Sequence, residues 1–156
     1  MTIQQPTKVK GKAVHQLIKQ TGGLDLNSVY YYYILCDFYR QTSAIAINEK
    51  EEVVGYLSAL VAPNDENSLF VWQVAVHPSA QGKGLSKQML EFVIQKNPHL
   101  SAIKTTIGPD NMASQGLFKS IAKKHNAKIY QETYLSSEDL GDHDPEILFT
   151  IKPINQ

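Results

Sequence analysis

The sequence has 156 residues and a hydrophobic fraction of 42%, which suits one domain with a substantial core and leaves no room for two ordinary domains. Fifteen basic residues balance fifteen acidic ones, so the chain lacks the net positive charge that would attract nucleic acid or an anionic membrane. The chain has a single cysteine, Cys36, which excludes an internal disulfide and a metal site built on a cysteine pair. A chain without disulfides suits the reducing cytoplasm. The polar N-terminus carries no apolar signal segment, and the longest apolar stretch, 53–62, is about half the ~20 residues of a membrane helix, so we expect a soluble cytoplasmic protein.

Hydrophobic spacing and turn residues predict two helices at the start of the chain. Apolar residues recur at helical intervals over 8–20, and the pair Gly22-Gly23 that follows is a typical helix end. Asn27 can cap a second helix, which continues to about Tyr39. We therefore expect a helix pair joined by a short loop.

The remainder of the chain alternates between strand and helix patterns. A meander of three strands comes first, followed by a helix, a strand, a helix and two strands. This order predicts one α/β (α+β) domain over residues 1–156, in which helices flank one mixed sheet. The predicted strands are 43–47, 53–61, 69–76, 103–107, 127–132 and 147–151, and the later helices are 84–95 and 111–124.

Charge is distributed unevenly along the chain. Residues 83–128 contain eight lysines and two carboxylates, whereas residues 129–156 contain six carboxylates and one lysine. A basic central region suits an anionic ligand, and an acidic tail suits a cationic one. Two differently solvated faces would explain the same charge pattern equally well.

A glycine-rich turn follows the predicted strand 69–76 and opens the next helix. Gly82 and Gly84 would let the backbone approach a ligand, and the first helical amides together with the helix dipole favour an anion such as phosphate. The spacing does not fit a P-loop, and Lys87 stands where a dinucleotide fingerprint needs its third glycine. A purely structural turn is the alternative.

Two motifs resemble those of the GNAT family of N-acetyltransferases. The run 81–86 is similar to the family's Gln/Arg-x-x-Gly-x-Gly/Ala loop, with Ser86 in place of the last small residue. The run 111–118 is similar to its Asn-x-x-Ala-x-x-Leu-Tyr element, with Ser114 in place of alanine. The resemblance covers essentially the whole chain and implies the GNAT fold, a mixed and mostly antiparallel sheet with splayed central strands between helices.

The resemblance also implies acetyl-CoA as co-substrate. Its pantetheine arm would lie between the strands 74–76 and 103–107, with its pyrophosphate on the amides of the loop 81–86 and Asn111 bonded to the arm. Asn111 also suits a helix N-cap, and the two roles are compatible. The implied cofactor contacts are Val74, Ala75, Val76, Gln81, Gly82, Lys83, Gly84, Leu85, Ser86, Asn111, Ser114 and Phe118.

Within the family, the chain resembles the members that acetylate L-2,4-diaminobutyrate in ectoine biosynthesis. The similar stretches are 23–28 together with Tyr30, 70–78 and the acidic 141–146. The resemblance implies acetyl transfer to the γ-amine of this small diamino acid, with no nucleic acid or membrane partner, and it favours a homodimer. A broader diamine or amino-acid acetyltransferase is the alternative in the same class.

Candidate acceptor contacts follow from the two ammonium groups of such a substrate, which need carboxylates or aromatic faces. Asp25 and Glu132 are the candidate anchors, Tyr30 and Trp72 the candidate walls, and Gln73 a further contact that could orient a water. The alternatives are an aspartate that helps to cap the second helix and a strand-end glutamate in water.

The sequence departs from many relatives at two catalytic positions. Gln73 stands where they carry a glutamate on the central strand, so the general base would be Glu132 or Asp25. Phe118 replaces the usual acid tyrosine, which leaves Tyr134 or solvent to protonate the thiolate. These replacements also make a non-catalytic acyl-CoA-binding sensor an alternative from another class.

Two further residue types carry no predicted chemistry. Cys36 could accept an acetyl group, but its place in an aromatic helix favours a small core residue, so we expect direct transfer to the amine. The five histidines have no metal-ligand spacing, and we expect no metal; His77 before Pro78 indicates loop geometry.

Overall fold

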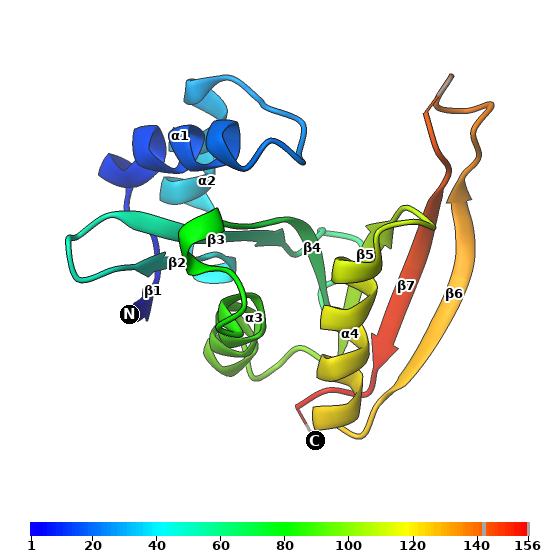
Figure 1. Ribbon diagram of the computed structural model, residues 1–156. Helices are drawn as coiled ribbons and strands as arrows, with labels where there is room; N and C mark the ends of the chain where they lie inside the picture. Colours follow the sequence, from blue (N-terminus) through cyan, green and yellow to red (C-terminus); the bar gives the residue numbers. More distant parts are fainter. Residues whose placement is uncertain (142, 156) are drawn as a thin grey trace. The chain divides into compact units, whose positions relative to one another are not determined.

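The computed structural model describes residues 1–141 and 143–155, which form two compact units (Figure 1). The first unit comprises Met1–Leu60 and Val71–Pro98, and the second comprises Val61–Phe70 and His99–Gln156. Asp142, part of the acidic stretch expected near the C-terminus, lies outside the described residues, as does Gln156. The single domain expected over 1–156 stays a prediction.

The first unit contains a sheet and the helices that cover it. The strand order in this sheet is β1-β2-β3-β4, and β4 belongs to the first unit from Val71 onward. The pairs β1–β2 and β2–β3 are antiparallel, with Ile3 opposite Ala46 and Ile45 opposite Tyr56. Its elements are β1 Thr2–Gln4, η1 Lys8–Lys10, α1 Gly11–Thr21, α2 Val29–Phe38, η2 Arg40–Thr42, β2 Ala44–Ile47, β3 Val53–Leu60, β4 Ser68–Val76, η3 Pro78–Ala80 and α3 Leu85–Lys96.

The helix ends show one confirmed prediction and one correction. α1 ends as expected, because Gly22 adopts a left-handed conformation with φ of 73° and its N–H bonds to the Ile18 carbonyl. The cap of α2 is Ser28, not Asn27 as the sequence predicted, because the Ser28 hydroxyl accepts a hydrogen bond from the N–H of Tyr31. Both residue types cap helices well, so the sequence pattern does not fix which of two neighbours does so.

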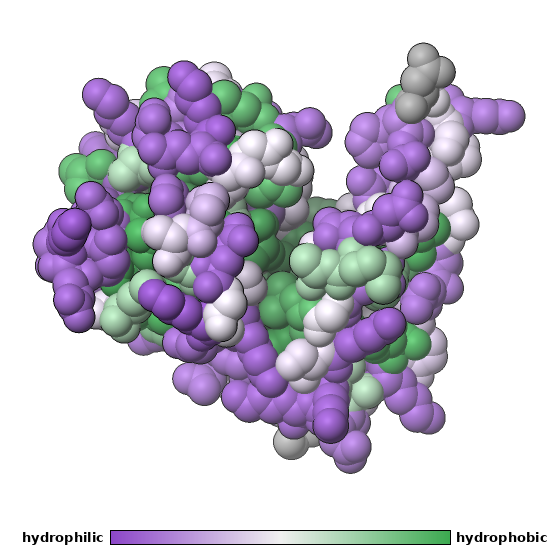
Figure 2. Space-filling model, viewed as in Figure 1, coloured by the Kyte–Doolittle hydropathy of each residue, from purple (hydrophilic) through white to green (hydrophobic). Residues whose placement is uncertain are grey.

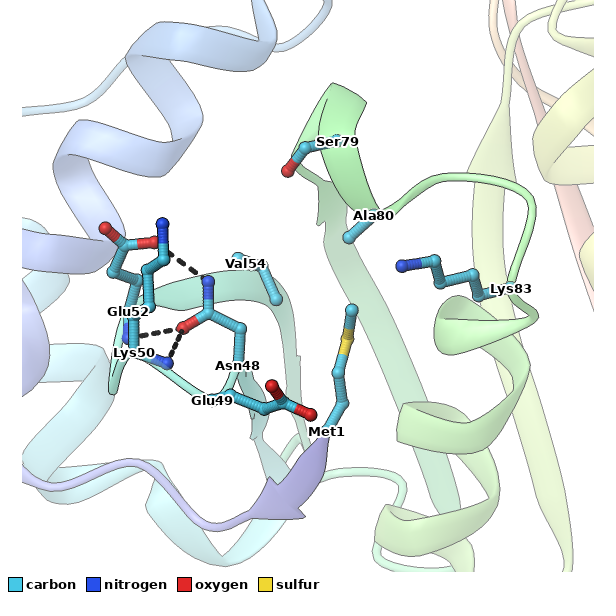
Figure 3. A pocket seen from close by; sticks show the side chains of 9 residues that line it. All are labelled: Met1, Asn48, Glu49, Lys50, Glu52, Val54, Ser79, Ala80 and Lys83. Atoms are coloured by element: carbon cyan, nitrogen blue, oxygen red, sulfur yellow. Dashed lines mark hydrogen bonds between the residues drawn. The ribbon is translucent and has the colours of Figure 1, made fainter.

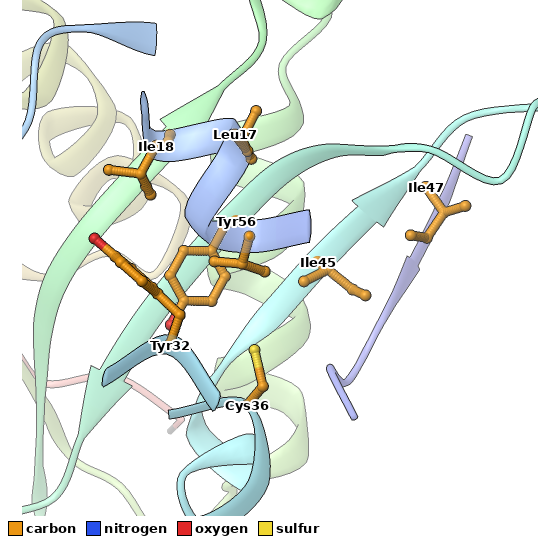
Figure 4. Packing of buried hydrophobic residues seen from close by; sticks show 9 residues of the cluster. Leu17, Ile18, Tyr32, Cys36, Ile45, Ile47 and Tyr56 are labelled. Atoms are coloured by element: carbon orange, nitrogen blue, oxygen red, sulfur yellow. The ribbon is translucent and has the colours of Figure 1, made fainter. Parts of the chain in front are cut away.

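The core of the first unit lies on both faces of its sheet. α1 and α2 cover one face and α3 covers the other (Figure 1). On the first face Leu17, Tyr32, Cys36 and Tyr56 pack in one buried cluster (Figure 4). Cys36 is therefore a core residue, as the sequence predicted.

Gly55 on β3 allows α3 to approach the opposite face. A Cβ atom at this position would lie 3.0 Å from the Cβ of Ala46 and 3.1 Å from the Cε of Met89, both shorter than normal van der Waals contact. The missing side chain at Gly55 therefore lets Met89 of α3 lie close to β2 and β3.

The second unit is built on the strand order β5-β7-β6, with both pairs antiparallel. Thr105 on β5 faces Phe149 on β7, and α4 packs against β6 and β7. An ion pair of 2.7 Å joins Lys104 to Asp65, and the hydrogen bond from Lys104 holds the pKa of Asp65 below its usual value. The elements are β5 Ala102–Ile107, α4 Met112–Lys124, β6 Lys128–Leu135 and β7 Glu146–Lys152.

The predicted elements are confirmed with small shifts at their ends, and one strand was missed. β1 has three residues, too few for an alternating pattern, and it forms by pairing with β2. β6 extends to Leu135, three residues beyond the predicted end. Within the described residues no helix combines the length and the apolar character needed to cross a membrane.

The tight contact at Gly55 predicts a loss of stability for Gly55→Ala. Because the new methyl group meets the fixed Cβ of Ala46 as well as Met89, the free energy of unfolding should fall by about 1 to 3 kcal/mol. Gly116→Ala, in α4 with no heavy atom within 4 Å of the new Cβ, should instead raise it by about 0.5 to 1 kcal/mol. Urea unfolding measures both, and equal effects of the two variants would contradict the assigned packing.

Candidate active site

The loop between β4 and α3 is held by its own backbone and by His77. The N–H of His77 donates to the Val54 carbonyl at 2.8 Å, and its ring Nδ1 accepts from the N–H of Ser79 at 3.1 Å. Gln81 joins the loop to the end of β4, because its Nε2 donates to the Val76 carbonyl at 3.1 Å. His77 is thus a loop residue, as predicted.

Two glycines shape the exposed end of this loop. Gly82 and Gly84 have φ of 79° and 73°, a left-handed conformation that favours glycine. Gly84 is the N-cap of α3 and supplies no side-chain cap, and a Cβ at Gly82 would find no atom within 4 Å. The backbone at the start of α3 is therefore open to an anion, and its dipole favours one.

On its other side the loop borders a cavity of about 640 Å³ in the first unit (Figure 3). Asn48 shapes the facing β2–β3 turn, since its Oδ1 accepts from the N–H groups of Lys50 and Glu52 at 2.9 Å each. The polar side chains of this turn lie at the left edge in Figure 2. The lining residues carry both signs of charge and are Met1, Asn48, Glu49, Lys50, Glu52, Val54, Ser79, Ala80 and Lys83.

Gln73, in the middle of β4, is 5% exposed and makes three hydrogen bonds. Its N–H donates to the Ser58 hydroxyl at 3.3 Å, and its Oε1 accepts from the Tyr32 hydroxyl at 3.3 Å. Its Nε2 donates to the Asp25 carbonyl at 3.0 Å. Gln73 therefore ties β4 to β3, to α2 and to the loop between α1 and α2. No local sequence pattern indicates this role, and the substrate contact expected of Gln73 stays a prediction.

Two of the expected acceptor residues, Asp25 and Gln73, are joined directly in the first unit. Asp25 has its backbone bonded to Gln73 while its side chain is exposed, and Trp72, the neighbour of Gln73, is 51% exposed. Tyr30 is 72% exposed. The tyrosine that packs on Trp72 is Tyr31, with ring centroids 5.6 Å apart and planes at 85°.

The flanking strand residues Val74 and Val76 are partly buried and Ala75 is buried. Lys83 is exposed, Leu85 is buried and Ser86 is partly buried at the start of α3. Their assignment to the cofactor stays a prediction.

The remaining expected site residues lie in the second unit. Asn111 is the N-cap of α4, as predicted, and its Oδ1 accepts from the N–H of Ser114 at 3.1 Å. Phe118 is buried, while Glu132, opposite Leu148 on β7, is exposed. The cofactor contacts of Asn111, Ser114 and Phe118 stay predictions. So does the approach of Glu132 to the acceptor.

Two other expectations concern the kind of chemistry. Burial raises the pKa of the Cys36 thiol to about 12, so this thiol stays protonated and is a poor nucleophile. Over 1–141 and 143–155 no group of three or more His, Cys, Asp or Glu residues could hold a metal ion.

Residues 12–122 match the model of the acetyltransferase (GNAT) family, which covers more than half of the chain. The chain therefore belongs to the GNAT family, and the expected family and fold class are confirmed.

Within the family, the chain is similar over nearly its whole length to enzymes that share one name. The L-2,4-diaminobutyric acid acetyltransferase of Virgibacillus pantothenticus is 41% identical over 155 residues, which cover 97% of each chain. The enzyme of the same name from Halomonas elongata is 39% identical over 97% of this chain and 80% of its own. The solved structure of diaminobutyrate acetyltransferase EctA from Paenibacillus lautus, in complex with L-2,4-diaminobutyric acid and coenzyme A, is 36% identical, covers 97% of this chain and 94% of its own, and has a TM-score of 0.92. The chain thus falls among the L-2,4-diaminobutyric acid acetyltransferases, as the resemblance implied.

The hydrogen bonds of Gln73 predict the effect of placing a glutamate at this position. In Gln73→Glu a buried carboxylate oxygen would face the Asp25 carbonyl, which should lower the free energy of unfolding by about 3 kcal/mol at pH 8. Such a carboxyl has a raised pKa in the folded state, so the loss relative to the parent should shrink as the pH falls towards 5.

Urea unfolding of both proteins at the two pH values measures this loss. Gln73→Leu is the control, because it loses both side-chain hydrogen bonds without adding a titrating group, so its deficit should not depend on pH. A Gln73→Glu protein as stable as the parent at pH 8 would contradict the assigned contacts.

Proposed function

We propose that the protein transfers the acetyl group of acetyl-CoA to the γ-amine of L-2,4-diaminobutyrate, a step of ectoine biosynthesis. The observation that carries this proposal is the similarity over 97% of the chain to the EctA structure, which holds diaminobutyric acid and coenzyme A. The relatives that share its name support the same substrate.

In this proposal the loop after β4 binds the pyrophosphate of acetyl-CoA. The left-handed Gly82 and Gly84 and the uncapped start of α3 fit such a group, because backbone N–H groups can reach an anion where no side chain intervenes. The main chain of Val74–Val76 would bind the pantetheine arm as a neighbouring strand would. The second family motif would bind the cofactor through Asn111, Ser114 and Phe118.

The acceptor would bind beside Trp72 with Asp25 and Glu132 as its carboxylate partners. Both carboxylates are exposed, so either can take a proton from the attacking ammonium directly or through water. The amine would then attack the thioester directly, and the buried, protonated Cys36 supports a route without an acetyl-enzyme. Tyr134, which is exposed on β6, or solvent would protonate the thiolate.

We also propose that the protein is a cytoplasmic homodimer. Phe38 on α2 and Val9 on η1 are each 74% exposed, and the two elements are in contact. Exposed apolar side chains on adjacent elements suit a subunit interface. The reduced, buried Cys36 suits the cytoplasm.

The test of the function is a comparison of acceptors. The protein is incubated with acetyl-CoA and diaminobutyrate, ornithine, lysine, putrescine or a peptide amine; free thiol is monitored and the acetyl group is located by NMR. Preference for diaminobutyrate with the label on the γ-nitrogen is expected. Preference for putrescine or the peptide would indicate a broader acetyltransferase, and no thiol release with any amine would indicate an acyl-CoA-binding sensor.

The two carboxylates predict a defect specific to the acceptor. Asp25→Asn and Glu132→Gln keep the side-chain shape but remove a charged contact worth about 1.5 to 3 kcal/mol, so kcat/KM for diaminobutyrate should fall by about one to two decades. Calorimetry should show unchanged affinity for acetyl-CoA. Glu49→Gln, on the exposed β2–β3 turn, is the control and should have the parent's kcat/KM. If Asp25→Asn and Glu132→Gln also keep the parent's kcat/KM, both carboxylates are excluded from the site.

The loop predicts a defect specific to acetyl-CoA. Gly84→Val places a branched side chain where φ is 73° and the backbone must approach the pyrophosphate, so the affinity for acetyl-CoA should fall by about tenfold or more. Gly22→Val introduces the same strain at the end of α1, where φ is also 73°, and should retain the parent's affinity. Unchanged binding by a folded Gly84→Val protein would refute the loop assignment.

A further inference from the structure

Tyr31 on α2 has a buried hydroxyl oxygen that finds no hydrogen-bond partner within 1–141 and 143–155. Leaving a buried hydroxyl unpaired costs folding free energy, so such a group in a native protein calls for an explanation. The sequence indicated no role for Tyr31, because the tyrosine expected at the wall of the acceptor site is Tyr30.

The surroundings of Tyr31 are residues of the proposed acceptor site. Its ring lies edge-on to Trp72, with centroids 5.6 Å apart, and to Tyr32, with centroids 5.0 Å apart. The Tyr32 hydroxyl donates to Gln73, and Gln73 in turn holds the backbone of Asp25. Tyr31 therefore adjoins the half-exposed Trp72 and the hydrogen-bonded group that positions the Asp25 loop.

The chemistry of Tyr31 suits the part of the substrate that Asp25 cannot bind. Asp25 attracts an ammonium group and repels a carboxylate, so the carboxylate of a diamino acid needs hydrogen-bond donors of its own. The Tyr32 hydroxyl and the Gln73 amide are already engaged. Burial, and secondarily Tyr32, raises the pKa of Tyr31 to about 12, so its hydroxyl keeps its proton at physiological pH and remains a donor.

We propose, on the basis of the proposed function, that the Tyr31 hydroxyl donates a hydrogen bond to the carboxylate of the amino-acid acceptor. This contact makes the enzyme prefer a diamino acid to the diamine of the same length. Substrate binding thereby supplies the partner that the Tyr31 hydroxyl lacks in the free protein.

The test compares Tyr31→Phe with the parent on two acceptors, diaminobutyrate and 1,3-diaminopropane, which is the same molecule without its carboxylate. For diaminobutyrate, kcat/KM should fall about 10- to 100-fold, mainly through KM, because a hydrogen bond to a charged group is lost. For 1,3-diaminopropane it should stay within about twofold. The melting temperature of the free protein should not fall, since the variant removes an unpaired hydroxyl.

Tyr33→Phe is the matched control, because it makes the same change on the same helix beside Gly11 and should leave both acceptors unaffected. An equal loss with both acceptors, or a lowered melting temperature, would show that Tyr31 has a structural role and would overturn the proposal. So would unchanged kinetics with diaminobutyrate in a parent that acetylates it. A parent that does not acetylate diaminobutyrate would instead refute the proposed function.

Discussion

The buried side chain of Gln73 is the contact on which the proposed acceptor site depends. It joins the middle of β4 to α2 through Tyr32 and to the loop between α1 and α2 through the Asp25 carbonyl. Because an amide can donate at one end and accept at the other, glutamine meets both partners where an ionised glutamate would meet only one. Because this amide cannot take a proton from an ammonium group, the proposed proton transfer falls to the exposed carboxylates of Asp25 and Glu132.

Two parts of the proposed site depend on β4. The loop that leads to α3 follows the end of this strand, and Gln73 lies in its middle. At its carboxyl end the chain turns through left-handed glycines that expose backbone amides, and a site made of backbone needs no charged side chain to attract an anion. In its middle, Trp72 packs against Tyr31 of α2, and Gln73 bonds to the backbone carbonyl of Asp25. In the proposed function, one strand therefore aligns the donor and the acceptor.

The sequence predicted the motifs and the order of the longer elements, since glycine turns and apolar spacing are local signals. It did not predict β1, which exists only by pairing with β2. It placed a helix cap one residue early, at Asn27, because Asn and Ser have the same capping chemistry. The role of Tyr30 as a wall of the acceptor site stays a prediction, but the sequence did not predict that the ring packed on Trp72 belongs to Tyr31. Helical orientation relative to a distant strand is a tertiary property that no local pattern carries.

A crystal structure of the protein with coenzyme A and diaminobutyrate would show directly whether the loop 81–86 and Asp25 bind the two substrates. We expect the pyrophosphate on the backbone N–H groups of 81–86 and an acceptor ammonium within hydrogen-bond distance of the Asp25 carboxylate. Gln73 should keep its contacts to Tyr32 and Asp25. A pyrophosphate bound away from this loop, or an acceptor with its carboxylate beside Asp25, would refute these assignments.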